Sequence, residues 1–226
     1  MTSDDFVRRQ GDGPPEVVLL PGWGTDWRIF GDLELPGSAL VARVPRPGGL
    51  GELLDGCSRD SVTLAGWSLG GFYAAKRAAE QPGPVKKLVL AGVRRSYPDG
   101  AVEDMLDELE EASETCLRDF YRRCFLPAQR EDYRWFRSEL MDDYLRTLQV
   151  ERLRNGLRRL RDVELQPSRL PPVPTTLVHG TRDAVAPLDE ARAIAHEADA
   201  AELRPVAGAG HAVFTHEIFR KVLDDG

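Results

Sequence analysis

Short apolar runs alternate along the chain with stretches in which apolar residues recur at every third or fourth position. Runs of this kind are typical of buried strands, and the recurring spacing is typical of helices. Strands are predicted over 6–9, 16–20, 40–44, 61–65, 85–91, 175–179 and 202–205, the first two forming a hairpin across the turn Gly-Asp-Gly-Pro-Pro. Helices are predicted over 52–59, 69–80, 187–197 and 214–223. This order indicates an α/β fold with a mostly parallel central sheet and helices on both faces.

The strand pattern is interrupted between residues 93 and 170. Two apolar stripes at helical spacing replace it, and we interpret both chiefly as core packing: Tyr133, Phe136, Leu140, Tyr144 and Leu148 on one helix, and Leu153, Leu157 and Leu160 on a second. The expected organisation is one domain over 1–226, with a core of 1–92 and 171–226 and a helical insertion over 93–170. The apolar runs are far shorter than the ~18 residues that span a bilayer. The acidic start lacks the apolar stretch of a signal peptide, so a cytoplasmic protein is expected.

The segment Gly66-Trp67-Ser68-Leu69-Gly70-Gly71 contains the pattern G-x-S-x-G between a predicted strand and an alanine-rich helix. A serine at such a sharp turn projects its hydroxyl from the edge of the sheet. Side chains at Gly66 and Gly70 would collide across the turn. The helix that follows offers free N–H groups to developing negative charge. Ser68 is therefore the candidate nucleophile.

A serine nucleophile needs a base, and the base needs an acid that orients it. Of the four histidines, His211 alone lies in a glycine turn between the last strand and the last helix, where a base can reach over Ser68. Asp183 follows the strand that ends at His179 and is the candidate acid. The alternatives are the three other histidines and the nearby carboxylate, His179, His196, His216 and Asp189.

The order Ser, Asp, His on this alternation of elements resembles the α/β-hydrolase fold over nearly the whole chain. The resemblance implies an oxyanion hole made by the backbone N–H groups of Leu69 and Trp23. Four short stretches, at 19–24, 66–71, 180–187 and 209–216, resemble the pimeloyl-acyl carrier protein methyl ester carboxylesterases of biotin synthesis. That resemblance implies a helical cap that lines the acyl channel, here with Phe120, Tyr121, Arg122, Arg123 and Cys124, and it implies that Trp23 in the stretch 19–24 also binds substrate.

Charge is unevenly distributed along the chain. The net charge is −7, yet residues 116–161 hold twelve arginines against seven acidic residues and are +5, which leaves −12 elsewhere. Acyl carrier proteins are small and acidic, so a basic rim would steer one toward the site. The arginines predicted to dock the carrier are Arg118, Arg130, Arg134, Arg137, Arg154 and Arg158. The bland alternative for this run is a solvated helix face.

The hypothesis is a serine carboxylesterase that cleaves the methyl ester of an acyl chain on acyl carrier protein. A general short-chain carboxylesterase or thioesterase with the same three residues is the alternative, and a binding protein that has kept only the fold is a second. No metal, organic cofactor, nucleic acid or membrane is implied, and a monomer is expected. The thiols of Cys57, Cys116 and Cys124 are expected to be unpaired.

Overall fold

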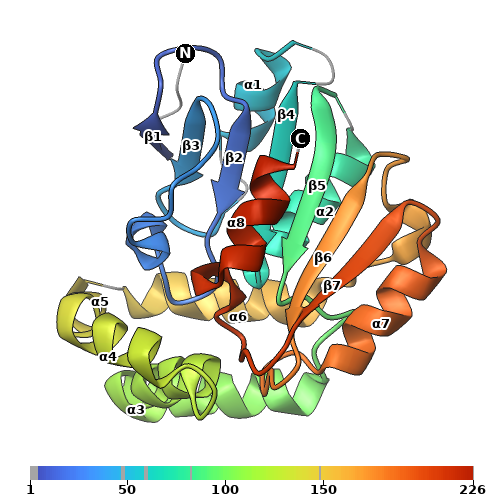
Figure 1. Ribbon diagram of the computed structural model, residues 1–226. Helices are drawn as coiled ribbons and strands as arrows, with labels where there is room; N and C mark the ends of the chain where they lie inside the picture. Colours follow the sequence, from blue (N-terminus) through green and yellow to red (C-terminus); the bar gives the residue numbers. More distant parts are fainter. Residues whose placement is uncertain (1–4, 47–48, 59–60, 82, 148, 226) are drawn as a thin grey trace.

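The structure is a computed structural model that describes residues 5–46, 49–58, 61–81, 83–147 and 149–225. These residues form one seven-stranded sheet in the order β1-β3-β2-β4-β5-β6-β7 (Figure 1). Its strands are β1 (Phe6–Gln10), β2 (Val17–Leu20), β3 (Ala39–Ala42), β4 (Val62–Trp67), β5 (Val85–Ala91), β6 (Thr175–Gly180) and β7 (Ala201–Val206). Only the pairing of β1 with β3 is antiparallel among these described strands. The predicted mostly parallel sheet is confirmed.

The predicted hairpin of the first two strands is wrong. β1 pairs with β3, with Phe6 opposite Ala42, and not with β2. All four residues of β2 are buried, and parallel strands occupy both of its edges, β3 on one side and β4 on the other. An apolar strand of this kind is typical of the inside of a parallel sheet. β1 can therefore only pair with the outer edge of β3.

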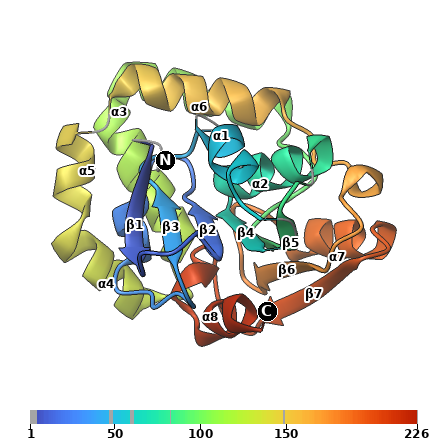
Figure 2. The ribbon, with the colours of Figure 1, turned by 90° about the horizontal axis from the view of Figure 1, so that it is seen from above.

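Helices cover both faces of the sheet, as predicted. Seen from above, α1 (Leu50–Asp55) and α2 (Leu69–Glu80) lie on one face and α8 (Glu217–Asp224) on the other (Figure 2). α7 (Leu188–Glu197) packs on β6 and β7. Single 3-10 turns occupy Trp27–Phe30, Pro167–Arg169 and Val213–Thr215. The turn Val213–Thr215 includes the first residues of the helix predicted over 214–223, and α8 therefore begins later than predicted, at Glu217.

Four helices fill the segment between β5 and β6: α3 (Asp99–Phe125), α4 (Arg130–Glu139), α5 (Met141–Thr147) and α6 (Val150–Asp162). In Figure 1 they lie across the lower edge of the sheet, toward which the arrows of β4 and β5 point. The segment therefore covers the carboxyl ends of the parallel strands, where ligands bind in open α/β sheets. In the described ranges, no helix has the length and apolar character needed to cross a membrane.

The predicted stripe from Tyr133 to Leu148 runs over two helices instead of one. α4 ends at Glu139, the C-cap Leu140 has non-helical φ −126° and ψ −31°, and α5 begins at Met141. Phe136, Leu140 and Tyr144 are buried as the stripe requires, whereas Leu148 lies outside the described residues. The spacing identified the buried face correctly but gave no sign of the break.

Candidate active site

Ser68 lies at the sharp turn between β4 and α2. Its φ of 52° is in the left-handed region, and no other non-glycine residue among those described has a positive φ. The turn closes only because glycines flank it: a Cβ on Gly66 would collide with the Gly70 carbonyl, and one on Gly70 with the Leu20 carbonyl. Such strain persists only where the surrounding structure enforces it, which is typical of functional sites. The Ser68 side chain is buried, with 2% of its surface exposed.

Asp183 and His211 are in direct contact, although 28 residues separate them. His211 Nδ1 donates to Asp183 Oδ2 over 2.8 Å, and both side chains are fully buried. The other carboxylate oxygen, Oδ1, accepts the N–H groups of Val185 and Ala186, each at 2.8 Å. Burial alone would raise the pKa of Asp183, but His211, His179 and the Ala186 N–H together lower it below its ordinary value. The carboxylate is therefore ionised and fixed toward the imidazole.

The loop that carries His211 is held from two sides. From the core, Trp67 Nε1 donates to the His211 carbonyl over 2.9 Å. From the last turn of α3, the Cys124 carbonyl accepts the His211 N–H at 2.9 Å. From the segment between α3 and α4, the Gln129 amide bonds the Gly210 N–H and the Ala212 carbonyl, both at 2.9 Å. The position of the imidazole thus depends on the inserted helices as well as on the sheet.

Ser68 and His211 contact two adjacent residues at the end of β5, Ala91 and Gly92. The Ser68 N–H donates to the Ala91 carbonyl over 2.8 Å, and a Cβ on Gly92 would lie 3.1 Å from the His211 ring. Because Nδ1 carries the proton given to Asp183, Nε2 has a free lone pair, and it has no hydrogen-bond partner in the described part of the chain. The bond from serine to histidine is often long before substrate binds.

Tyr97, which no sequence pattern singled out, also reaches this site. Burial, and after it the nearby Asp183 charge, raises the pKa of its phenol, whereas the Ser68 side chain acts in the opposite direction. Arg94 lies over the ring, 5.1 Å from its centre, and its guanidinium bonds Glu190 of α7 over 3.1 Å. Tyr97 is thus a neutral phenol close to Ser68 and Asp183.

The two backbone groups predicted for the oxyanion hole are the N–H of Leu69, which directly follows Ser68, and the N–H of Trp23 in the loop after β2. Leu69 is the first residue of α2, so its N–H has no acceptor within the helix. The Trp23 side chain is buried, its Nε1 donates to the Leu153 carbonyl of α6 over 2.8 Å, and Phe120 of α3 packs edge-on against it with ring centres 4.8 Å apart. The inserted helices therefore fix the loop that carries the Trp23 N–H.

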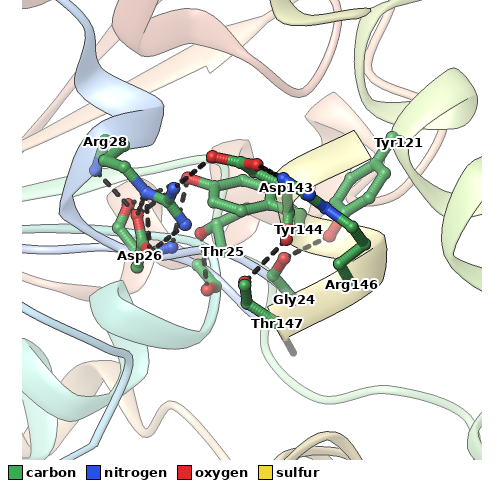
Figure 3. Close-up of polar contacts among 10 residues, drawn as sticks. Gly24, Thr25, Asp26, Arg28, Tyr121, Asp143, Tyr144, Arg146 and Thr147 are labelled. Atoms are coloured by element: carbon green, nitrogen blue, oxygen red, sulfur yellow. Dashed lines mark hydrogen bonds and ion pairs between the residues drawn. The ribbon is translucent and has the colours of Figure 1, made fainter. Parts of the chain in front are cut away.

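A polar cluster fixes the same loop further along (Figure 3). The Tyr121 hydroxyl donates to the Gly24 carbonyl, and the Tyr144 hydroxyl bonds the Asp26 carboxylate over 3.0 Å. Arg28 connects the loop to α5, because its guanidinium lies 2.8 Å from Asp26 of the loop and 3.2 Å from Asp143 of α5. Helices α3 and α5 are thus bonded to the loop after β2.

Gly156 of α6 lets that helix approach the loop closely. A Cβ at this position would lie 2.5 Å from Trp23 Cδ1 and 3.7 Å from Leu69 Cδ2. Gly156→Ala is therefore expected to lower the free energy of unfolding by about 1–3 kcal/mol, because the packed site cannot admit the extra methyl. It also displaces the Trp23 N–H, so kcat is expected to fall by about tenfold. Thermal unfolding and ester kinetics measure the two effects.

Gly100→Ala is the matched control for this prediction. Gly100 is also helical, in the first turn of α3, but a Cβ there meets nothing within 4 Å. Alanine favours helix over glycine, so this variant is expected to keep wild-type kcat and to unfold at the same or a higher temperature. Equal effects of the two substitutions would show that the contact with Trp23 is unimportant.

The residues predicted to line the acyl channel do not all face one way. Phe120, Tyr121 and Cys124 are buried in α3 on the side of the Trp23 loop and the His211 loop. Arg122 and Arg123 are exposed on the opposite side of the helix, so the structure places them outside any such channel. At 100° per residue, these two positions fall away from the buried face.

Arg122 and Arg123 instead border an open groove of about 830 Å³ with α4. Five arginines line it: Arg122, Arg123, Arg130, Arg134 and Arg137. Glu108 and Asp119 are the acidic residues of its lining, which also contains Leu126, Pro127 and Tyr133. None of the five guanidinium groups forms an ion pair within the ranges that the structure describes. We call this surface the arginine groove.

Three of the six arginines predicted to dock a carrier, Arg118, Arg154 and Arg158, lie elsewhere. Arg118 Nη2 is 2.7 Å from Glu114, and Arg154 Nε is 3.1 Å from Glu110. Arg158 is exposed on α6, which does not contribute to the groove lining. The reason is that α6 packs along α3, whose first half is rich in acidic residues, and not beside α4. The arginines of α4 and those of α6 therefore do not form one surface.

A mostly parallel sheet that carries a serine at this turn, with an Asp–His pair on the loops after β6 and β7, is the architecture of the α/β hydrolases. Residues 6–218 match the family described as "Alpha/beta hydrolase family", and the chain belongs to it. The resemblance seen in the motifs and the predicted fold are both confirmed.

Named relatives narrow the comparison. The chain is 28% identical to a pimeloyl-[acyl-carrier protein] methyl ester esterase of Chromobacterium violaceum, over 94% of this chain and 93% of that protein. It is 29% identical to the protein of the same name from Aromatoleum aromaticum, over 88% and 92%. Among solved structures, the enol-lactonase from Burkholderia xenovorans LB400 has the same fold, with a TM-score of 0.82 at 17% identity over 97% and 95%.

Proposed function

We propose that the chain is a serine carboxylesterase that hydrolyses the methyl ester of an acyl chain on acyl carrier protein, such as the pimeloyl ester of biotin synthesis. The observation that carries the esterase proposal is the buried Asp183–His211 hydrogen bond beside a serine in the left-handed conformation. The names of two relatives matched over nearly their whole length support the substrate.

In the proposed reaction, Ser68 Oγ attacks the ester carbonyl while His211 Nε2 takes its proton. Asp183 stabilises the imidazolium that forms, and the N–H groups of Trp23 and Leu69 bind the negative oxygen of the tetrahedral intermediate. His211 then gives the proton to the leaving methanol. A water molecule, deprotonated by His211, then attacks the acyl-enzyme, and His211 returns this proton to Ser68 Oγ as the free acid leaves. Apart from the ester and this water, the steps use only side chains and backbone groups of the protein.

The arginine groove supports the choice of an acidic carrier. The lining of the groove contains five arginines and only two acidic residues, and the five guanidinium groups have no ion-pair partner among the described residues. The surface is therefore net positive and attracts anionic proteins. The groove also borders the site, because the segment from Cys124 to Gln129 lines it on one side and bonds the His211 loop on the other. A carrier docked there would lie next to the catalytic loop.

Reversing the charge of Arg130, Arg134 and Arg137 together tests the docking surface. The triple variant to glutamate is expected to lower kcat/KM for an acyl-carrier-protein methyl ester by about 10- to 100-fold at low salt. The difference from wild type should shrink as the salt concentration rises, because ions screen exposed charges. Hydrolysis of a small p-nitrophenyl ester should stay at the wild-type rate.

Arg158→Glu is the control, since Arg158 is exposed on α6 and outside the groove lining. It is expected to leave carrier turnover nearly unchanged.

A general short-chain esterase or thioesterase is the second candidate, favoured by the ion pairs that Arg118 and Arg154 make within the chain. Equal turnover of the carrier substrate by wild type and the triple variant, together with fast hydrolysis of small esters, would decide for that candidate.

A further inference from the structure

A second histidine, His179, is buried beside the proposed catalytic pair. It is the fifth residue of β6, and its side chain is fully buried. His179 Nε2 is 2.6 Å from the Ala186 carbonyl oxygen. A carbonyl only accepts, so Nε2 carries the ring proton. The other nitrogen, Nδ1, has no partner in the described part of the chain.

His179 also contacts the carboxylate of Asp183. Its Nε2 is 3.5 Å from Oδ2, the same oxygen that accepts the proton of His211 Nδ1. Ala186 connects the two groups a second time: its N–H donates to Asp183 Oδ1, and its carbonyl accepts from His179. The His179 imidazole therefore holds Ala186, the last residue of the turn 183–186 that binds the Asp183 carboxylate.

We propose that His179 is a positioning residue, a neutral donor that fixes the turn 183–186 and so keeps Asp183 aimed at His211. The proposal rests on the function proposed above for Ser68, Asp183 and His211. It gives a role to a group that takes no part in the proton transfers themselves.

The neutral state of His179 follows from its surroundings. Burial lowers its pKa, against the opposing effect of Asp183. A proton on Nδ1 would have no acceptor among the described residues, and a buried unpaired donor is costly. A charged His179 would also compete for Asp183 with the imidazolium that forms on His211 during the reaction. A neutral donor positions the carboxylate without weakening its effect on His211.

Two substitutions at this position separate the donor from the space it fills. Glutamine places an N–H near the position of Nε2, whereas phenylalanine fills the same volume without a donor. We expect His179→Gln to keep kcat on a small ester within about threefold of wild type. His179→Phe should lower kcat by about 10- to 100-fold with little change in KM, because a misplaced catalytic group slows the chemical step.

The hydrogen bond itself supplies a readout that does not depend on turnover. We expect the proton between His211 Nδ1 and Asp183 to resonate at low field in the NMR spectrum of wild type, to shift or broaden in His179→Phe and to persist in His179→Gln. Melting temperatures of both variants report how far the fold is destabilised.

The outcomes distinguish this proposal from the one on which it rests. If His179→Phe lowers the melting temperature but leaves kcat and the low-field signal unchanged, His179 only packs the core and the proposal is wrong. Equal loss in the glutamine and phenylalanine variants would likewise overturn the donor role. If wild type hydrolyses no ester, the esterase proposal fails, while the NMR comparison still tests the effect of His179 on Asp183 and His211.

Discussion

Ser68→Ala is expected to abolish ester hydrolysis, with kcat lowered by on the order of 10⁴- to 10⁶-fold. The substitution removes the oxygen that attacks the ester and leaves His211 without a proton to take. Little else changes, because alanine occupies nearly the same volume in a site that is 2% exposed. Melting at the wild-type temperature would show that the fold is intact.

Two measurements check this result. Steady-state kinetics on a p-nitrophenyl ester give the loss in rate, and a fluorophosphonate probe should label wild type at Ser68 and leave the variant unlabelled. Ser138→Ala is the control, because Ser138 is exposed on α4. Among the described residues, its hydroxyl bonds only a backbone carbonyl of its own helix and the side chain of the adjacent Glu139. Turnover in purified Ser68→Ala above a few per cent of wild type would rule out the proposed nucleophile.

The turn around Ser68 was predictable because its signals are local. Helix α2 has the predicted bounds, and β4 covers all but the first residue of the strand predicted over 61–65, since an apolar run and an alanine-rich stretch favour one structure each without help from elsewhere. Ser68 stands in a motif whose glycines are required by the close approach of the Leu20 and Gly70 carbonyls. Local sequence therefore specified both the element and the reactive side chain.

The pairing of β1 was not predictable in the same way. A Gly-Asp-Gly-Pro-Pro turn is compatible with a hairpin, and only the demand of β2 for parallel neighbours on both edges excludes it. That demand depends on β3 and β4, which follow later in the chain. The break of the inserted helix at Leu140 is similarly hidden, because the apolar spacing continues across it.

The surroundings of the site depend on contacts between distant segments, which the sequence does not display. Gln129 holds the His211 loop from 81 residues away in the chain, and Tyr97 lies close enough to Ser68 and Asp183 for both to affect the pKa of its phenol. His179 is one of the alternative bases in the sequence, but its place beside Asp183 follows only from the folded turn. Helical spacing, by contrast, is enough to predict that Arg122 and Arg123 lie on a different face of the helix from Phe120.

Asp183→Asn is the second substitution with a large expected effect, and it tests the direction of the hydrogen bond to His211. An asparagine oxygen can still accept the N–H groups of Val185 and Ala186, which leaves its NH₂ group facing His211 Nδ1. Because the amide donates, the imidazole must accept at Nδ1 and carry its proton on Nε2. In that tautomer it has no lone pair for the proton of Ser68, so kcat is expected to fall by about 10⁴-fold.

Asp189→Asn provides the matched control, because Asp189 was the rival candidate for the acid. Asp189 lies in the first turn of α7, largely exposed, and pairs with Arg192 over 2.7 Å. Losing an exposed ion pair of this kind changes stability by less than about 1 kcal/mol, and kcat should equal that of wild type. Ester kinetics and the low-field NMR proton are compared for both variants. The signal should vanish only in Asp183→Asn, since that proton exists only while a carboxylate accepts it. A fully active Asp183→Asn would show that His211 needs no anion and would assign the orienting role to another group.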